Sequence, residues 1–185
     1  PKGITVDYLV KIKGLCAQKS VKFVMDSSGA PLTRIKELNP LFYKGNMVEF
    51  AEIYPKLAGK FNIDENIFDS MGPNEILDYF INIAREIDRS KLNIITLGKY
   101  GSVAIDNEGI VYAEYKTDAL YTVGCGDAFL GGLIFGLLNK KSLVETLAIA
   151  TSCGVSNTEI LGAGIIDKKR VEELKGAIRI MHKKI

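Results

Sequence analysis

The residues best suited to chemistry lie in one short stretch, where Gly124 and Gly126 flank Cys125 and Asp127 follows at once. An apolar run rich in small residues comes next, so we predict a tight turn and a buried helix over residues 121–136. The first turn of a helix has unpaired N–H groups and the positive end of the helix dipole, which together bind anions. A carboxylate placed there could take a proton from a hydroxyl while the amides hold a phosphoryl group.

Two candidate groups also have an ordinary structural interpretation. A carboxylate such as Asp127 in a first helical turn often only complements the dipole, which is worth about 0.3–1 kcal/mol. Asn46 and Glu49 have the spacing of a capping box, with Asn46 before the helix and Glu49 at its third position. Mg²⁺ is often held through one or two carboxylates plus phosphates, so Glu49 could serve both purposes.

Glycines also follow a buried apolar stretch at residues 93–97. In Thr96-Leu-Gly-Lys-Tyr-Gly101, the two glycines would let backbone amides approach a nucleotide phosphate. The same spacing is also that of a plain turn between two strands, and both interpretations stay open.

Composition limits the class of protein. The chain has 185 residues, of which 47% are hydrophobic and 25% charged, as expected for one soluble globular domain. A net charge of +2 does not indicate binding to nucleic acid or to an anionic membrane. Cys16, Cys125 and Cys153 are far apart, which argues against disulfides or a zinc site and favours a reducing, cytoplasmic location. His182 is the only histidine, so a Ser/His/Asp triad is not expected.

The periodicity of apolar residues predicts strands alternating with helices, and therefore a mostly parallel sheet covered on both faces. We expect helices over residues 6–19, 32–38, 46–54, 74–89, 121–136, 142–157 and 167–181. We expect strands over residues 21–26, 41–44, 93–97, 102–105 and 110–115. Residues 55–73 are polar and predict no regular element and no chemistry. In such sheets ligands bind beyond the carboxyl ends of the strands.

The glycine turn resembles a known signature. Val123-Gly-Cys-Gly-Asp-Ala-Phe129, followed by a glycine-rich helix, is similar to the motif of the ribokinase-like sugar kinases, the PfkB carbohydrate kinase family, which usually reads Gly-Ala-Gly-Asp. Two further segments agree in the same order along the chain. Lys44-Gly-Asn-Met-Val-Glu49 resembles the family's Lys-Pro-Asn-x-x-Glu, and Thr96 to Gly101 resembles its Thr-Leu-Gly-x-x-Gly.

One more segment indicates a branch of the family. Asp26-Ser-Ser-Gly-Ala-Pro-Leu32 resembles a segment of the 1-phosphofructokinase and tagatose-6-phosphate kinase group, although a strand-to-helix turn would also use Asp, Ser and Gly. The resemblance covers nearly all of this chain but only the C-terminal part of the family. It implies a single α/β domain over residues 1–185, with a ribokinase-like three-layer α/β/α fold from which the family's N-terminal part is absent.

The resemblance also implies a function, namely ATP-dependent phosphorylation of a hydroxyl of a sugar or sugar phosphate. Asp127 would be the catalytic base, and the amides of Gly124, Cys125 and Gly126 would hold the transferred phosphate. Asn46 and Glu49 would help to place Mg²⁺. The nucleotide would be bound by Lys44, Thr96, Gly98, Gly101, Gly154 and Asn157.

Three departures from the family pattern matter. Tyr121 stands where the family often has Asp or Asn, which puts a monovalent-cation site in doubt. Gly45 replaces a proline and removes backbone stiffness. Cys125 replaces an alanine, and a thiol at a helix N-terminus is expected to have a lowered pKa. Two alternatives stay open, a kinase for a nucleoside or another sugar, and a nucleotide-binding fragment without catalytic activity. A homodimer also stays open.

Overall fold

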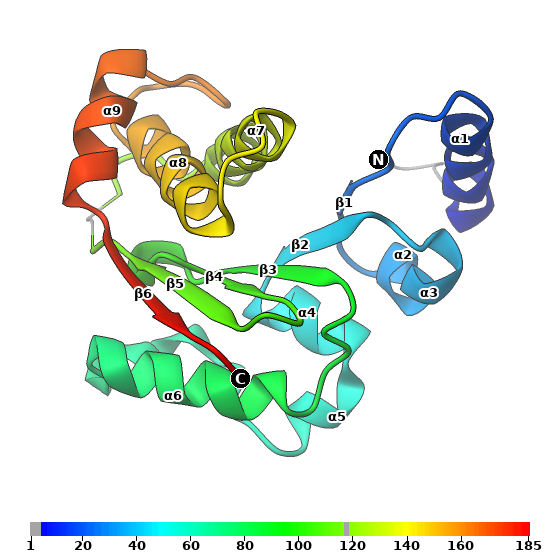
Figure 1. The fold of residues 1–185 in the computed structure, drawn as a ribbon, viewed down its shortest axis with the longest axis horizontal. Helices are drawn as coiled ribbons and strands as arrows, with labels where there is room; N and C mark the ends of the chain where they lie inside the picture. Colours follow the sequence, from blue (N-terminus) through cyan, green and yellow to red (C-terminus); the bar gives the residue numbers. More distant parts are fainter. Residues whose placement is uncertain (1–4, 117–118) are drawn as a thin grey trace.

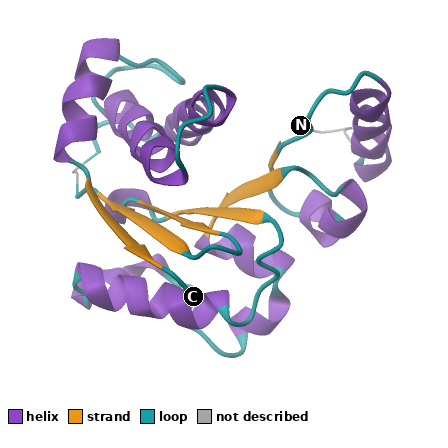
Figure 2. Ribbon diagram, viewed as in Figure 1, coloured by secondary structure: helices purple, strands orange, loops and turns teal. Residues whose placement is uncertain are grey.

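A computed structural model describes residues 5–116 and 119–185. These residues form a six-stranded sheet in the order β1-β2-β3-β4-β5-β6 (Figures 1 and 2). The strands are β1 (Met25–Asp26), β2 (Phe42–Asn46), β3 (Leu92–Thr96), β4 (Ser102–Ile105), β5 (Ile110–Glu114) and β6 (Arg179–Lys183). The α-helices are α1 (Val6–Gln18), α2 (Ala30–Thr33), α3 (Ile35–Leu38), α4 (Met47–Ile53), α5 (Pro55–Ala58), α6 (Pro73–Ala84), α7 (Cys125–Leu138), α8 (Leu143–Thr158) and α9 (Lys168–Ala177). Two 3₁₀ helices, η1 (Glu65–Ser70) and η2 (Gly98–Tyr100), complete the described elements.

The direction of the strands confirms a mostly parallel sheet. β1 pairs with β2 and β2 with β3 in parallel, while β3, β4, β5 and β6 pair successively antiparallel. Four strands, β1, β2, β3 and β5, therefore run in one direction. The carboxyl ends of β1, β2 and β3 lie together at one edge of the sheet, where a ligand site is expected.

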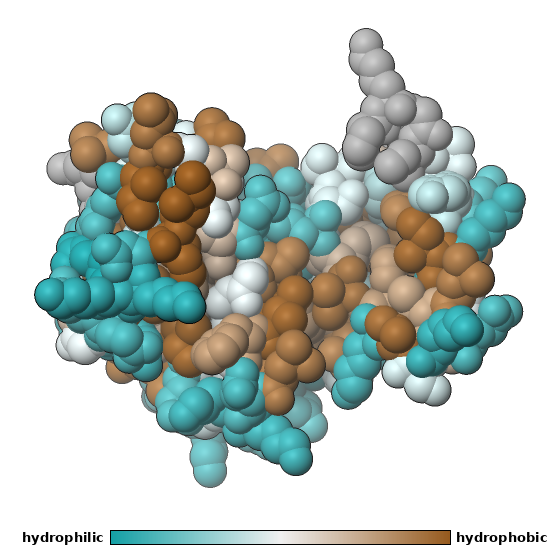
Figure 3. Space-filling view, turned by 90° about the horizontal axis from the view of Figure 1, so that it is seen from above, coloured by the Kyte–Doolittle hydropathy of each residue, from teal (hydrophilic) through white to brown (hydrophobic). Residues whose placement is uncertain are grey.

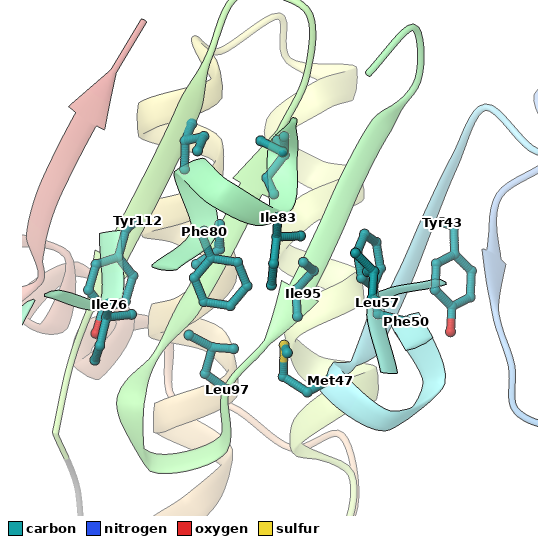
Figure 4. Close-up of a cluster of buried hydrophobic side chains, with 14 of the residues drawn as sticks. Tyr43, Met47, Phe50, Leu57, Ile76, Phe80, Ile83, Ile95, Leu97 and Tyr112 are labelled. Carbon is teal, nitrogen blue, oxygen red and sulfur yellow. The ribbon is translucent and has the colours of Figure 1, made fainter. Parts of the chain in front are cut away.

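Both faces of the sheet are covered, as the three-layer prediction requires (Figure 1). On one face, α4, α5 and α6 enclose a core that includes Phe50, Phe80 and Ile95, which Figure 4 shows packed together. On the other face, Phe129 of α7 and Leu147 of α8 pack against the sheet. None of the helices in the described ranges is long and apolar enough to cross a membrane.

Four segments differ from the sequence prediction. The strand expected over 21–26 is paired only at β1, and the helix expected over 74–89 is α6, which ends at Ala84. The segment 55–73 is not irregular, since it contains α5 and η1. The last helix ends at Ala177 rather than 181, because residues 179–183 add β6 to the edge of β5, and a pairing distant in sequence outweighs local helix propensity.

The glycine-rich sequence of α7 is explained by its contact with α8. A Cβ at Gly132 would lie 2.9 Å from the Cα of Ala150, and one at Gly136 would lie 2.8 Å from the Thr146 side chain. The two helix backbones therefore approach closely along the middle and the end of α7. α7 still leaves Phe135 and Leu138 largely exposed. Figure 3 shows that hydrophobic residues form several patches on the face seen from above.

Candidate active site

The predicted turn lies at the start of α7, and Gly124 precedes the helix with φ +82°. A Cβ at this position would collide with the backbone of Ala163 and Gly164. Only glycine combines this left-handed conformation with such a close approach. The loop at 162–164 therefore packs directly against the turn and holds it in place.

Asn157 of α8 hydrogen-bonds the backbone of the same turn and of the loop that packs against it. Its side chain is fully buried; Nδ2 donates to Val123 O (3.0 Å) and Oδ1 accepts from the N–H of Ile165 (3.1 Å). Asn157 was expected to bind the nucleotide, but the structure places its amide between two loops and not in the wall of the adjacent cavity. Its role here is to fix the shape of the turn.

We expect Gly124→Ala to destabilise the fold by about 1–3 kcal/mol, because it forces a left-handed alanine into a space already occupied by backbone. The matched control is Gly131→Ala in the exposed part of α7, where an added Cβ meets nothing within 4 Å. That change should stabilise by about 0.5–1 kcal/mol, since alanine favours a helix interior. Urea unfolding of both variants checks this, and equal effects would contradict the assigned role of the turn.

Asp127 lies in the first turn of α7 with its side chain exposed. The Cys125 N–H makes a long hydrogen bond to Thr122 O (3.4 Å). The N–H groups of Gly126 and Asp127 have no partner within the helix, because they precede its first complete turn. The carboxylate of Asp127 is thus next to amides that can donate to an anion.

Lys44 adds a positive charge to this turn. A Cβ at Gly126 would lie 3.2 Å from Lys44 Nζ, and Nζ is 2.7 Å from Asp26 Oδ2. The Lys44 side chain is 6% exposed and the Asp26 side chain 25%. An ammonium group beside the positive end of a helix favours a negatively charged ligand, and the Asp26 carboxylate offsets the burial of that charge.

The replacement of proline by Gly45 has a steric reason. A Cβ at Gly45 would collide with the hydroxyl of Tyr43, which donates to Ser27 O (3.2 Å). Tyr43 and Gly45 lie on the same face of β2, so the tyrosine occupies the space that a proline ring would need. The exchange preserves the path of the strand that carries Lys44.

Asn46 and Glu49 form the capping box expected from their spacing. Asn46 Oδ1 accepts from the Glu49 N–H (2.9 Å), and Glu49 Oε2 accepts from the Asn46 N–H (2.8 Å). These oxygen atoms suit Mg²⁺ chemically. No cluster of three or more ligating His, Cys, Asp or Glu side chains occurs within the described residues. A metal held here would therefore complete its shell with phosphates and water, and this role stays a prediction.

Beside the turn lies a cavity of about 260 Å³. Its walls bring together six of the predicted site residues: Thr96, Gly98, Gly101, Cys125, Gly126 and Gly154. The sequence interpretation missed eight others, which are Lys99, Tyr115, Ala119, Thr122, Phe129, Thr151, Val155 and Thr158. A signal for part of this wall existed, because residues 151, 154, 155 and 158 have the spacing of one helical face.

A further missed residue is Glu65, which lies in the segment that predicted no chemistry. A Cβ at Gly98 would lie 3.2 Å from Glu65 Oε2, and the backbone of Met47 hydrogen-bonds to this carboxylate. Glu65 therefore joins the start of α4 to the glycine turn after β3. Burial raises the pKa of Glu65 above its usual value.

We expect Glu65→Gln to raise the free energy of unfolding near pH 7. A raised pKa in the folded state means that folding disfavours the charged carboxylate. This penalty is fully present at neutral pH. It decreases as the pH falls through the folded-state pKa and is gone below the ordinary pKa of about 4.5. The stabilisation should therefore shrink on acidification. Urea unfolding between neutral and acid pH measures it.

Glu145→Gln is the control, for which we expect the opposite change in the free energy of unfolding. The hydrogen bond from Ser142 lowers the pKa of Glu145, so the native carboxylate contributes stability above its unfolded pKa and loses it as the pH falls through the folded pKa. Glu145→Gln should thus destabilise at neutral pH. A Glu65 variant that behaved like the Glu145 variant would contradict the burial argument.

The predicted lowering of the Cys125 pKa is wrong. Burial raises the pKa of this thiol, and this outweighs the hydrogen bond from Asn157, which lowers it. Sγ itself donates to Tyr121 O (3.3 Å). The sulfur is therefore held against the preceding backbone, where loss of solvent matters more than the hydrogen bond from Asn157.

A three-layer α/β fold in which a glycine turn, an exposed carboxylate and a cavity lie together is typical of the ribokinase-like kinases. The chain belongs to the pfkB family of carbohydrate kinases, whose family profile matches residues 1–169.

Curated relatives agree with this membership. The chain is 28% identical to the 1-phosphofructokinase of Haemophilus influenzae, over 97% of this chain and 54% of the relative. It is also 28% identical to the D-tagatose-1-phosphate kinase of Klebsiella oxytoca, over 98% of this chain and 55% of the relative. The chain thus spans about half the length of these relatives.

Solved structures share the fold. The phosphofructokinase-2 of Escherichia coli in complex with substrates and products superposes with a TM-score of 0.72 at 18% identity, over 96% of this chain and 54% of that one. A nucleoside kinase of Burkholderia thailandensis in complex with inosine gives a TM-score of 0.62 at 21% identity, over 92% of this chain and 53% of that one.

Proposed function

We propose that this chain is the nucleotide-binding and catalytic-base portion of a kinase that transfers the terminal phosphate of ATP to a hydroxyl of a sugar phosphate. One arrangement carries the proposal. Asp127 is exposed in the first turn of α7, which has unpaired backbone amides. The ammonium of Lys44, from β2, lies beside this turn, and a cavity opens next to it.

Each group has a distinct task in this transfer. Asp127 accepts the proton of the acceptor hydroxyl as the bond to phosphorus forms. The amides of the turn and the ammonium of Lys44 stabilise the charge on the phosphoryl oxygens in the transition state. Phosphoryl transfer depends mainly on such positioning and electrostatic stabilisation. The capping box of Asn46 and Glu49 fixes the start of α4, and the Glu65 carboxylate lies between this point and the glycine turn after β3.

Mg²⁺, when bound with the nucleotide, would neutralise phosphate charge, and Asn46 and Glu49 are the residues that would hold it. The cavity lined by Thr151, Gly154 and Val155 would take the nucleoside part of ATP, since its walls are mostly apolar.

For the acceptor, the names of the two relatives favour a ketohexose 1-phosphate over the 6-phosphate that the sequence resemblance also left open. The similarity to a nucleoside kinase rests on the fold alone, at 21% identity, and names no residue of this chain. We therefore place D-fructose 1-phosphate and D-tagatose 1-phosphate first among the acceptors to test.

Calorimetric titration with MgATP tests the nucleotide site. We expect binding with a Kd of about 1 μM–1 mM, within the usual range for enzyme substrates. Gly154→Leu should abolish it, because the added side chain would enter the cavity from α8. Gly176→Leu on α9, where an added Cβ meets nothing within 4 Å, should leave it unchanged. A chain that is folded by circular dichroism and binds no MgATP would refute the proposed site.

A further inference from the structure

A second cavity lies at the opposite edge of the sheet from the catalytic turn. It has a volume of about 460 Å³ and is formed by three segments, residues 35–43, 53–56 and 86–93. Phe42 and Leu92 line it at the starts of the parallel strands β2 and β3. We call it the basal cavity. Its volume lies within the range of about 300–1,000 Å³ that small-molecule sites occupy.

Three lysines surround the basal cavity, one from each segment. Lys36 is on α3, Lys56 is on α5 and Lys91 immediately precedes β3, and all three are exposed. Within the described part of the chain, none of their ammonium groups makes an ion pair or a hydrogen bond, whereas other lysines such as Lys60 and Lys44 do. Three unpaired positive charges around one hollow favour an anion.

The two carboxylates at the cavity offset only part of this charge. Glu86 is paired with Lys60, which lies outside the lining (2.7 Å). Asp88 accepts a hydrogen bond from the Ser90 N–H (2.9 Å). Hydrogen bonds from the side chain and the backbone of Ser90, together with the charges of Lys91 and Lys36, lower the pKa of Asp88. With Lys60 included, the surroundings hold four positive charges against two negative ones.

The inner wall is apolar, and its polar groups are already satisfied. Tyr54 Oη donates to Asn93 Oδ1 (3.2 Å), and Asn93 Nδ2 donates to Asp88 O (3.0 Å) and Lys91 O (2.9 Å). Ile53 and Leu92, which are half-buried, add hydrocarbon surface. The cavity thus offers apolar walls with positive charge at the rim, and no unpaired polar group in its floor is evident.

We propose that the basal cavity is a second binding site, which takes a small organic anion. Lys36, Lys56 and Lys91 hold its carboxylate or phosphate group, and Ile53, Tyr54 and Leu92 contact its hydrocarbon body. The site is separate from the proposed nucleotide site and does not depend on that assignment. It shares β2 with the catalytic end, since Phe42 starts the strand that carries Lys44 two residues further on.

Phenyl phosphate is a suitable probe, because it combines an aromatic body with a dianionic group. We expect it to shift the backbone amide resonances of residues 53–56 and 91–93. The triple variant Lys36→Gln, Lys56→Gln, Lys91→Gln should bind it about tenfold more weakly by titration, since exposed charges contribute modest and salt-sensitive attraction. The triple variant Lys11→Gln, Lys168→Gln, Lys169→Gln removes the same charge from exposed positions elsewhere and should bind as the wild type does.

Two results would overturn the proposal. One is equal affinity of the wild type and the basal triple variant for phenyl phosphate. The other is a set of shifted amides confined to the turn at 124–127 together with loss of binding in Lys44→Met, which would assign the anion to the catalytic turn. Phenol and inorganic phosphate as separate probes should each bind more weakly than phenyl phosphate, since each lacks one half of the recognised chemistry.

Discussion

Asp127→Asn is expected to lower the rate of phosphoryl transfer by about 10²–10⁴-fold, the usual contribution of a general base. The amide keeps the size of the side chain and its position in the first turn of α7, but it cannot accept the acceptor's proton. The affinity for MgATP should change little, because the carboxylate is exposed beside the turn and does not line the cavity. The assay follows ADP formation with D-fructose 1-phosphate and D-tagatose 1-phosphate.

The chain should be assayed by itself and as a chimera in which residues 5–185 replace the corresponding part of the Haemophilus influenzae 1-phosphofructokinase. If the chain alone is inactive, the chimera shows whether it lacks an acceptor site or a catalytic base. The rest of the relative can supply an acceptor site, but it cannot replace the base at Asp127. Asp78→Asn, at an exposed position of α6, is the control and should retain full activity. An Asp127→Asn chimera with more than a few per cent of the parent activity would show that another group accepts the proton.

The turn could be predicted from sequence because its determinants are local. Gly124 needs a left-handed conformation, and Asn46 with Glu49 needs only the three-residue spacing of a capping box. Thr96, Gly98 and Gly101 were found for the same reason, since Thr96 ends a strand with a clear apolar pattern and the two glycines lie within five residues of that end. Strand ends of a parallel sheet converge, so residues identified separately along the chain were expected to meet.

Contacts between distant segments could not be predicted in this way. Nothing near Lys44 in the sequence indicates that its ammonium reaches Asp26 and Gly126. Glu65 lies in a segment without periodicity, and it reaches Gly98 only because η1 packs under the sheet. β6 forms because β5 leaves an edge open, and that edge exists only once the sheet has formed. Asn157 was predicted from a motif on α8 to bind the nucleotide. Its side chain is instead buried and hydrogen-bonds the backbone of Val123 and Ile165 behind the turn.

The pair of Lys44 and Asp26 gives the second large expected effect. Lys44→Met should lower phosphoryl transfer by about 10²–10³-fold, as expected when one preorganised positive group is removed from the transition state. It should weaken the binding of MgATP more than the binding of adenosine, because the lost charge lies beside Gly126, where we propose that the phosphates bind, and not in the cavity wall. The measurements are turnover in the chimera and calorimetry on the chain.

Replacing Asp26 and replacing Lys44 should lower the free energy of unfolding by different amounts. Asp26→Asn leaves an ammonium that is 6% exposed without its carboxylate, and breaking a buried pair in this way costs about 3–5 kcal/mol. Lys44→Met leaves a carboxylate that is 25% exposed and can be hydrated, so its effect should be smaller. The double variant should regain part of the loss, because no uncompensated buried charge remains. Lys60→Met breaks an exposed pair and should change the free energy of unfolding by about 0–1 kcal/mol. If Lys44→Met destabilised more than Asp26→Asn, the lysine would be the main structural partner, and its position beside Gly126 would then be explained by packing rather than by phosphate binding.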